Sequence, residues 1–442
     1  FQRSPLLRSS FLLMKWRSLR TFMQADFHAS MKSAHKNVRV NSNLQRSAAG
    51  VALFILVKYA IINSTTERIK ESMNQDRLNE GLKEAVKGFE IEGTFVECKP
   101  CGNGHINDTY MLTVEKEGKQ QRYSLQHMNR QVFKNPVSLM QNILKVTDYL
   151  KEEITKRGGQ PQRETLDFVR SKDGKLYFID SLGEYWRAYH FIEGAYAPQE
   201  NCSPQDFYES AVAFGRFQKM LSGFPADSLE ETIAGFHDTK ARFAAFEKAV
   251  EEDCCQRAAG VEEEIRFVKE RYDVACVLGE LLEKGELPLR VTHNDTKSNN
   301  VLIDEETGKG LCVIDLDTVM PGLAVNDFGD SIRFGASTAA EDEKDLSKVS
   351  CDLELYDLYT KGFIEGCGGT LTPMEIKCLP LGAKVMTYEC GMRFLADYLA
   401  GDVYFKTDYP AHNLDRARTQ FKLVADMEEK WQDIEAIISK YL

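Results

Sequence analysis

The chain of 442 residues has no excess of positive charge. Its 56 lysines and arginines face 67 aspartates and glutamates, which gives a formal net charge of −11 at pH 7. Nucleic-acid phosphates attract basic surfaces, so this balance argues against a protein that binds nucleic acid. Prolines number only 12, and no stretch is repeated or dominated by a few residue types. These absences exclude a repeat or low-complexity chain and indicate a globular protein of two or three domains.

Long hydrophobic runs are also missing. The apolar stretch 48–62 has 15 residues and contains Lys58, whereas a membrane-spanning helix needs about 20 apolar residues. It lies in a basic segment, since residues 1–72 hold 12 Lys and Arg against 3 Asp and Glu. We expect residues 1–72 to be a disordered tail, a targeting segment or non-native upstream sequence, with Met73 as the natural start. We expect no membrane partner.

The cysteines form no framework. Eleven are scattered along the chain, and Cys98 and Cys101 make a CxxC spacing with no second pair to complete a zinc site. We interpret these two as ordinary thiols rather than metal ligands. Thiols used in this way fit a reducing compartment, so we expect the protein to be cytoplasmic.

A β-hairpin with a glycine-rich turn is predicted near residue 100. Residues 94–98 and 110–114 have strand character, and the turn between them contains Gly102 and Gly104. Glycines let a backbone approach phosphate groups closely and offer its N–H groups to them. Hairpins with glycine are common, however, so this turn alone does not identify a nucleotide site.

The strongest chemical signal lies further along the chain. Residues 293–300 read His-Asn-Asp-Thr-Lys-Ser-Asn-Asn, and two short apolar strands follow, of which the second ends at Asp315. Two strands paired around a tight turn would bring Asp295, Asn300 and Asp315 together. Phosphoryl transfer needs such a set, because one carboxylate accepts the proton of the attacking hydroxyl while an amide and a second carboxylate hold Mg²⁺. The alternative is that these residues only serve turns.

With these motifs the chain resembles the aminoglycoside phosphotransferase/choline kinase superfamily, and within it the N-acetylhexosamine 1-kinases. The resemblance extends over residues 75–430 and is most specific in the catalytic motif. The matching segments are residues 131–136, 186–189, 293–297, 314–322, 326–335, 404–405 and 412–418.

This resemblance implies an α+β, protein-kinase-like fold of two lobes. Residues 73–192 would form a small N-terminal lobe with an antiparallel sheet, the nucleotide loop and the hinge. Residues 193–442 would form a larger, mainly helical C-terminal lobe with the catalytic loop, the metal loop and the acceptor site. The resemblance also implies ATP as the co-substrate and Mg²⁺ as the metal ion.

The family's roles carry over to the matching positions. Asp295 would be the catalytic base that orients the acceptor hydroxyl, and it would therefore also contact the acceptor. Asn300 and Asp315 would hold the metal ion, and Gly102 and Gly104 would lie over the nucleotide phosphates.

The nucleotide site departs from the family pattern at one position. The backbone from His190 to Ile192 would be the hinge that hydrogen-bonds adenine. Such kinases usually place Lys or Arg on the third strand to bind the nucleotide phosphates, whereas this chain has His127 there. A neutral imidazole donates one hydrogen bond but lacks a permanent charge. Arg130 or Lys134 would have to compensate.

Acceptor contacts are expected from the C-terminal region. Arg393 is the first candidate for a sugar contact and Tyr404 the second. A structural salt bridge is the alternative role for Arg393, and Trp186 is expected in the core rather than under a sugar ring. Asp327 and Asp330 are expected to support loops rather than to bind the metal ion.

The sequence therefore predicts transfer of the ATP γ-phosphoryl group to the anomeric hydroxyl of N-acetylgalactosamine or N-acetylglucosamine. A kinase of another small alcohol, such as an aminoglycoside, choline or homoserine, is the nearest alternative. A nucleotide-binding protein without activity is a third hypothesis, motivated only by His127. A membrane-tethered form that uses residues 48–62 is a fourth.

Overall fold

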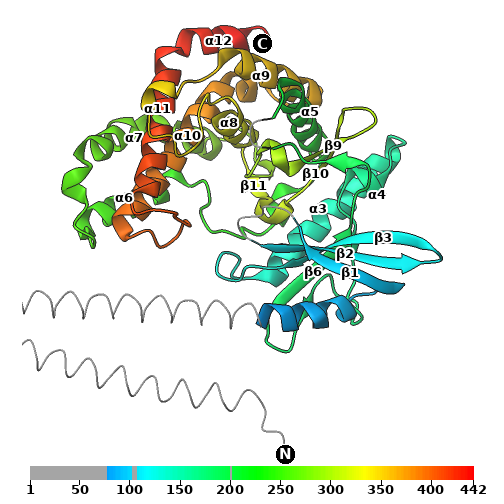
Figure 1. Ribbon diagram of the computed structural model, residues 1–442. Helices are drawn as coiled ribbons and strands as arrows, with labels where there is room; N and C mark the ends of the chain where they lie inside the picture. Colours follow the sequence, from blue (N-terminus) through cyan, green and yellow to red (C-terminus); the bar gives the residue numbers. More distant parts are fainter. Residues whose placement is uncertain (1–76, 102–106, 200–201) are drawn as a thin grey trace, which may run out of the picture. The chain divides into compact units, whose positions relative to one another are not determined.

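The computed structural model describes residues 77–101, 107–199 and 202–442. Residues 80–442 form one compact unit, in which a small antiparallel sheet precedes a mainly helical part (Figure 1). This confirms the predicted two-lobed α+β fold. The expected tail, residues 1–72, lies outside the described residues.

The N-terminal sheet has the strand order β1-β2-β3-β6-β4, and β5 pairs with β6. Its pairings are antiparallel, and β2 and β3 form a continuous hairpin from Asp108 paired with His127 to Lys116 paired with Lys119. The strands are β1 (Thr94–Pro100), β2 (Asp108–Lys116), β3 (Lys119–His127), β4 (Phe168–Val169), β5 (Phe178–Ile179) and β6 (Tyr185–His190).

The two faces of this sheet have different neighbours. Side chains alternate between the faces of a strand, so Trp186 points one way along β6 and Arg187 the other. On the Trp186 face, residues 80–88 are helical, and Gly81 lies so close that an added Cβ would be 3.1 Å from the Trp186 ring. Trp186 is fully buried there, which confirms its predicted place in the core. In Figure 1 this helix, at the blue end of the coloured chain, lies across the sheet from the C-terminal helices.

Helix α3 (Pro136–Lys156) follows β3 in the chain and packs with the C-terminal core. Pro136 stands in its first turn, where a missing N–H costs nothing, and the Asn135 side chain accepts a hydrogen bond from the Ser138 N–H. Its buried residues recur every three or four positions, which produces one apolar face. The short helix α4 (Pro161–Glu164) follows.

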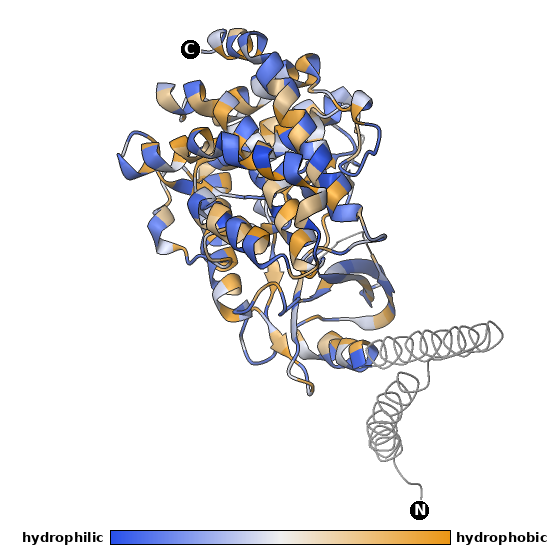
Figure 2. Cartoon of the chain, turned by 90° about the vertical axis from the view of Figure 1, so that its left-hand side faces the viewer, coloured by the Kyte–Doolittle hydropathy of each residue, from blue (hydrophilic) through white to orange (hydrophobic). Residues whose placement is uncertain are grey.

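Eight longer helices make up most of the C-terminal part, and the hydrophobic colour in Figure 2 alternates with hydrophilic colour along them, as in amphipathic helices. Aromatic side chains of α8 and α9 fill its centre, with Phe328 against Tyr356, Tyr359 and Phe363. The helices are α5 (Pro204–Met220), α6 (Thr239–Glu252), α7 (Glu262–Glu283), α8 (Ala324–Gly335), α9 (Leu353–Cys367), α10 (Pro373–Ala400), α11 (His412–Glu429) and α12 (Trp431–Ser439). The short 3-10 turns are η1 (Ala226–Ser228), η2 (Ala258–Gly260), η3 (Ser298–Asn300), η4 (Leu316–Thr318) and η5 (Leu346–Lys348).

Two small sheets among these helices hold the predicted catalytic segments. One has the order β10-β9-β7 and the other pairs β11 with β8. The segment that contains Asp295 joins β8 to β9, and the segment that contains Asp315 joins β10 to β11. The strands are β7 (Ala195–Tyr196), β8 (Arg290–Thr292), β9 (Val301–Asp304), β10 (Gly310–Val313) and β11 (Met320–Gly322).

Two structural features bear on membrane insertion and on metal binding by thiols. In the part of the chain that the structure describes, no helix combines the length and the apolar character that a bilayer span requires. The apolar stretch 48–62 lies outside the described residues. Cys98 and Cys101 are free thiols, and burial raises the pKa of Cys98 to about 11. Such a thiol stays protonated at neutral pH, which agrees with the interpretation of these cysteines as ordinary thiols.

Candidate active site

Asp295 lies at the centre of a loop that the protein holds rigidly. The loop begins with Asn294 in the left-handed backbone region, with φ of 65°. The buried carboxylate of Asp327 accepts hydrogen bonds from the N–H of His293 at 2.9 Å and of Asn294 at 2.8 Å. Asp330 accepts from the N–H of Thr296 at 2.9 Å. Both aspartates therefore support the catalytic loop, as their predicted role requires.

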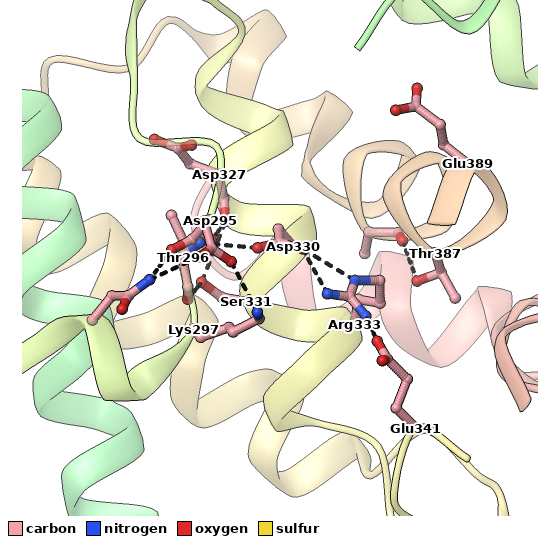
Figure 3. Close-up of polar contacts among 12 residues, drawn as sticks. Asp295, Thr296, Lys297, Asp327, Asp330, Ser331, Arg333, Glu341, Thr387 and Glu389 are labelled. Atoms are coloured by element: carbon pink, nitrogen blue, oxygen red, sulfur yellow. Dashed lines mark hydrogen bonds and ion pairs between the residues drawn. The ribbon is translucent and has the colours of Figure 1, made fainter. Parts of the chain in front are cut away.

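Helix α8 supplies these supports from one face. Asp327, Asp330 and Arg333 are three residues apart, and such a spacing places side chains on the same side of a helix. The Arg333 guanidinium bonds the second oxygen of Asp330 at 3.0 Å and reaches Glu341 at 2.8 Å. Figure 3 shows Asp330 between the catalytic loop and Arg333.

The Asp295 carboxylate has two cationic or donor neighbours. One oxygen lies 3.2 Å from the Lys297 Nζ, and the other accepts a hydrogen bond from the Asn300 Nδ2 at 3.1 Å. Removal from bulk water would by itself raise the pKa of this carboxyl, but the charge of Lys297 and the hydrogen bonds from Lys297 and Asn300 favour its ionised form, and the pKa lies below its usual value. Asp295 is therefore ionised at neutral pH, as a general base must be.

Lys297 stays charged beside this base. The negative charge of Asp295 raises the Lys297 pKa, and Asp330 and Glu341 add to this effect. The ammonium group thus lies 3.2 Å from the carboxylate of the predicted base. The sequence motif contains Lys297, but the motif alone does not indicate a role for this residue.

His293 fixes the catalytic loop, which joins β8 to β9, to the segment that joins β10 to β11 and contains Asp315 (the metal loop). Its Nε2 donates to the Ile314 carbonyl at 2.8 Å, and its Nδ1 accepts from the Asp295 N–H at 3.3 Å. The Ile314 N–H in turn donates to the Asn300 carbonyl at 2.9 Å. These contacts bring Asp295, Asn300 and the residue before Asp315 together, as the predicted pairing of two strands around a tight turn required.

The Asp315 side chain is open to solvent and has no donor of its own. Its backbone is in the left-handed region, with φ of 58°, which is unusual for a residue other than glycine. Among the described residues, no N–H group donates to its carboxylate. Although the side chain reaches solvent, the protein around it displaces enough water to raise its pKa to about 7. The charges of Asp317 and Asp295 add to this shift in pKa, and the charge of Arg187 opposes it.

This arrangement fits a magnesium ion. A solvent-accessible carboxylate with two like charges nearby, and with the nearby Arg187 bound to Asp317, favours a cation. Asn300 uses its Nδ2 on Asp295, which leaves its Oδ1 as a second hard oxygen ligand. No group of three His, Cys, Asp or Glu side chains within residues 77–101, 107–199 and 202–442 could hold a metal ion. The protein therefore offers a partial coordination shell of the kind that nucleotide phosphates complete.

Asp317 is bound from the N-terminal sheet. Arg187 of β6 donates to both of its oxygens, with the Nη2 contact at 3.0 Å, and Asn107 donates through Nδ2 at 2.6 Å. Both members of the Arg187–Asp317 pair are buried. The sequence does not indicate that these two residues form a pair, although both stand in segments that carry the family resemblance.

The predicted nucleotide residues are placed as follows. Gly102 and Gly104 lie outside the described residues. The His127 Nδ1 lies 3.1 Å from the Asp108 carboxylate, and its ring packs against Trp186 with the centroids 5.1 Å apart. No observation tests a phosphate contact by His127, which stays a prediction.

The predicted hinge directly follows β6. The His190 N–H donates to the Asp167 carbonyl at 2.9 Å, and the Phe191 N–H donates to the Arg122 carbonyl at 3.0 Å. Both N–H groups are thus engaged within the protein. A base that binds here has to use the His190 carbonyl or the Ile192 N–H, so the adenine contact also stays a prediction.

Arg393 lies in a cage of three aromatic rings. Its guanidinium carbon is 5.3 Å from the Phe236 ring centroid, 5.9 Å from Tyr404 and 5.5 Å from Phe405. In the part of the chain that the structure describes, no carboxylate lies within ion-pair distance of Arg393. The structural salt bridge considered for this residue is therefore not formed, and its N–H donors remain available to a ligand.

The loop that carries Tyr404 is ordered by one carboxylate. Asp397 of α10 accepts hydrogen bonds from the N–H groups of Val403, Tyr404 and Phe405 at 2.8–3.0 Å. Gly401 ends α10 with φ of 95°, which a glycine adopts without strain. This support was also missed, because a helical aspartate in a sequence gives no sign of the loop it binds.

Cys390 of α10 has a thiol with a shifted pKa. Burial raises the pKa of its thiol to about 11, and the charges of Arg333 and Arg393 oppose that shift. Such a thiol stays protonated at neutral pH.

Known proteins resemble this chain in sequence pattern and in fold. A sequence model of the phosphotransferase enzyme family (APH) matches residues 97–348, more than half of the chain. The aminoglycoside phosphotransferase from Alicyclobacillus acidocaldarius subsp. acidocaldarius DSM 446 is similar in structure, with a TM-score of 0.50 and 13% identity over 81% of this chain and 95% of that one. Choline kinase from Cryptosporidium parvum Iowa II has a TM-score of 0.48 and 17% identity over 79% and 93%. At these identities the structural likeness concerns the fold alone.

Proposed function

This chain belongs to the phosphotransferase enzyme family, and on that premise we propose that it transfers the γ-phosphoryl group of ATP to the anomeric hydroxyl of an N-acetylhexosamine. The products would be ADP and the sugar 1-phosphate. Asp295, Asn300 and Asp315 supply the base and the metal ligands, and Arg393 and Tyr404 bind the sugar.

The chain's own residues would orient the acceptor and take up its proton. The ionised Asp295 carboxylate accepts the proton of the attacking hydroxyl, while Lys297 and Asn300 keep it in place. The Lys297 ammonium lies where negative charge is transferred, so it stabilises the reacting phosphoryl oxygens. Catalysis then consists mainly of positioning and of charge stabilisation, as this reaction type requires.

Magnesium would be held by Asp315 and the Asn300 Oδ1. When bound, the ion neutralises the nucleotide phosphates and aligns them for in-line transfer. His293 keeps these ligands in register with the base through its hydrogen bond to the Ile314 carbonyl.

The observation that carries the choice of acceptor is the cage around Arg393. Aromatic rings pack against the apolar faces of sugars, and an unpaired guanidinium donates to hydroxyl or acetamide oxygens. A second cation, Arg242, lies near enough that Arg393 lowers its pKa, in addition to the effect of burial. Glu389 of α10 is engaged by His237 and Thr239. Two cations with no free carboxylate favour a neutral acceptor over a polycationic aminoglycoside or choline.

A substrate panel tests this proposal. The full-length protein is incubated with ATP and Mg²⁺, and ADP release is followed with N-acetylgalactosamine, N-acetylglucosamine, kanamycin, choline and homoserine. We expect turnover on the hexosamines only. Asp295→Asn should abolish it, because an amide cannot accept the proton.

A methyl glycoside separates the anomeric hydroxyl from the others. Methyl N-acetyl-α-galactosaminide lacks a free anomeric hydroxyl and should not be phosphorylated, whereas ³¹P NMR of the reducing sugar should show a 1-phosphate. Phosphorylation of the glycoside would mean a different hydroxyl is the acceptor. Turnover confined to kanamycin, choline or homoserine would retain the reaction type and discard the hexosamine.

A further inference from the structure

The sheet carries a buried cation on the face opposite His127. In β3 and β6, His127 pairs with Trp186 and Gln126 pairs with Arg187. Directly paired residues share a face of the sheet. His127 therefore lies with Trp186 on the face that helical residues 80–88 cover, whereas Arg187 points toward the metal loop.

Arg187 is completely engaged by polar partners. Its Nε donates to the Gln126 Oε1 at 2.7 Å, and its two terminal nitrogens donate to the two oxygens of Asp317. Fork-to-fork contacts of this kind fix the direction of both side chains. Since Asp317 follows Asp315 by two residues, the position of Arg187 determines the position of the metal loop.

Asn107 joins the same carboxylate to the β2–β3 hairpin. Its Nδ2 donates to Asp317 at 2.6 Å, and its Oδ1 accepts from the Asn129 N–H at 3.0 Å. Asn107 immediately precedes β2, and Asn129 follows β3 by two residues. The Asp317 carboxylate thus binds Arg187 of β6 directly, and through Asn107 it is connected to the open end of the β2–β3 hairpin.

We propose that Arg187 is the positioning residue for the magnesium–nucleotide complex, in place of a basic residue on the third strand. Through Asp317 it holds the metal loop, and through Asp317 and Asn107 it aligns that loop with the hairpin. The inference rests on nucleotide-dependent phosphoryl transfer and is independent of which acceptor the protein uses.

The competing explanation is a buried ion pair that only stabilises the fold. The structure offers a matched control for it. Arg271 of α7 donates from Nε and Nη2 to the Glu428 carboxylate of α11, and its polar partners among the described residues lie in α7 and α11 only. Replacing Arg271 removes a partly buried two-nitrogen ion pair without touching Asp317 or the hinge.

The test measures MgADP binding by isothermal titration calorimetry on the full-length protein without any acceptor. Positioning residues behind metal ligands typically change affinity by about 10–100-fold, and we expect Arg187→Gln to weaken MgADP by this factor. Arg271→Gln and His127→Ala should change it by less than about threefold. In turnover assays, Arg187→Gln should raise the KM for MgATP and leave the acceptor KM unchanged.

A double variant covers the case in which Arg187→Gln does not fold. Arg187→Met combined with Asp317→Leu replaces the buried ion pair by an apolar contact, which is often neutral for stability. Because it removes the hydrogen bonds that hold the metal loop, we expect it to fold but to bind MgADP as weakly as the single variant. Wild-type affinity in the double variant would overturn the proposal, because the pair would then serve stability alone. Loss of MgADP binding on His127→Ala, with Arg187→Gln unaffected, would also overturn it.

Discussion

Three carboxylates lie near one another in the site, and two of them are paired with cations. Asp295 is paired with Lys297, and Asp317 is paired with Arg187. Asp315 forms no ion pair among the described residues, and partial removal from water together with the charges of Asp317 and Asp295 raises its pKa. This division of charge suits the three roles: an ionised base, a fixed structural anchor, and a ligand that needs a metal ion.

Lys297 should contribute to the rate and little to nucleotide binding. Removing one charged group that stabilises a transition state typically costs about 10²–10³-fold in kcat, and we expect this loss for Lys297→Met. Steady-state kinetics with saturating ATP and acceptor would measure it. Lys240→Met is the matched control, since Lys240 pairs with Glu283 at an exposed position. An unchanged kcat in Lys297→Met would show that the ion pair only orders the loop.

At the scale of single elements, the acceptor end depends on the segment between α10 and α11. Asp397 binds this segment with both oxygens, and the second oxygen also accepts from the Asn413 Nδ2 at 2.9 Å. Four donors therefore converge on one carboxylate. The aromatic cage around Arg393 includes Tyr404 and Phe405, so its shape follows from this support.

Asp397→Asn should loosen the Tyr404 loop selectively. The new amide would direct N–H groups at donors that the carboxylate now accepts, and hydrogen bonds to charged groups contribute about 1.5–3 kcal/mol. We expect the acceptor KM to rise about 10-fold or more with the MgATP KM unchanged. Hydrogen exchange of residues 401–411 should accelerate. Asp408→Asn, in the same loop with a side chain 90% exposed, should leave both constants as they are.

The packing of α10 on α11 can be tested at Gly391. A Cβ at this position would lie 2.6 Å from the Phe421 ring, so Gly391→Ala forces the two helices apart. Overpacking of this kind costs about 1–3 kcal/mol of unfolding free energy. Gly279 in α7 has open space around it, and Gly279→Ala should instead stabilise by about 1 kcal/mol. Urea denaturation of both variants would measure the opposite signs.

At the scale of the whole unit of residues 80–442, nucleotide and metal should stabilise the fold together. A ligand at about 100 times its Kd adds about 2.7 kcal/mol to the unfolding free energy, or about 3–4 °C in the midpoint for a unit of this size. We expect this increase with ADP and Mg²⁺ and a much smaller one with ADP and EDTA in scanning fluorimetry. Asp315→Asn should abolish the difference between the two conditions. An equal difference in that variant would place the metal ion elsewhere.

The catalytic core of the site could be predicted because its residues are close in sequence. Asp295 and Asn300 stand on one loop, and the next strand pair returns the chain to Asp315, so spacing alone brings them together. The support by Asp330 was also accessible, since the spacing of three residues along α8 marks a helix face.

The contacts that depend on strand orientation could not be predicted. Whether Trp186 or Arg187 faces the site is decided by which side of the sheet the helical residues 80–88 cover, and no local pattern specifies that side. A phosphate contact was expected for His127 because of its position in the third strand, and the sequence did not specify which face of the sheet this residue occupies. Its environment became visible only with the register of β3 on β6.

The Arg187–Asp317 pair also has a consequence for the order of events during protein synthesis. The two residues are 130 positions apart, so at about 5–20 residues per second the ribosome needs about 6–26 s to produce the partner after the arginine. During that interval the nascent sheet holds a guanidinium that no carboxylate neutralises, and burying it alone would be costly. The completed sheet is therefore expected to assemble late, when the metal loop has left the ribosome. Shortened nascent chains would then resemble an unfinished enzyme rather than a folded first half.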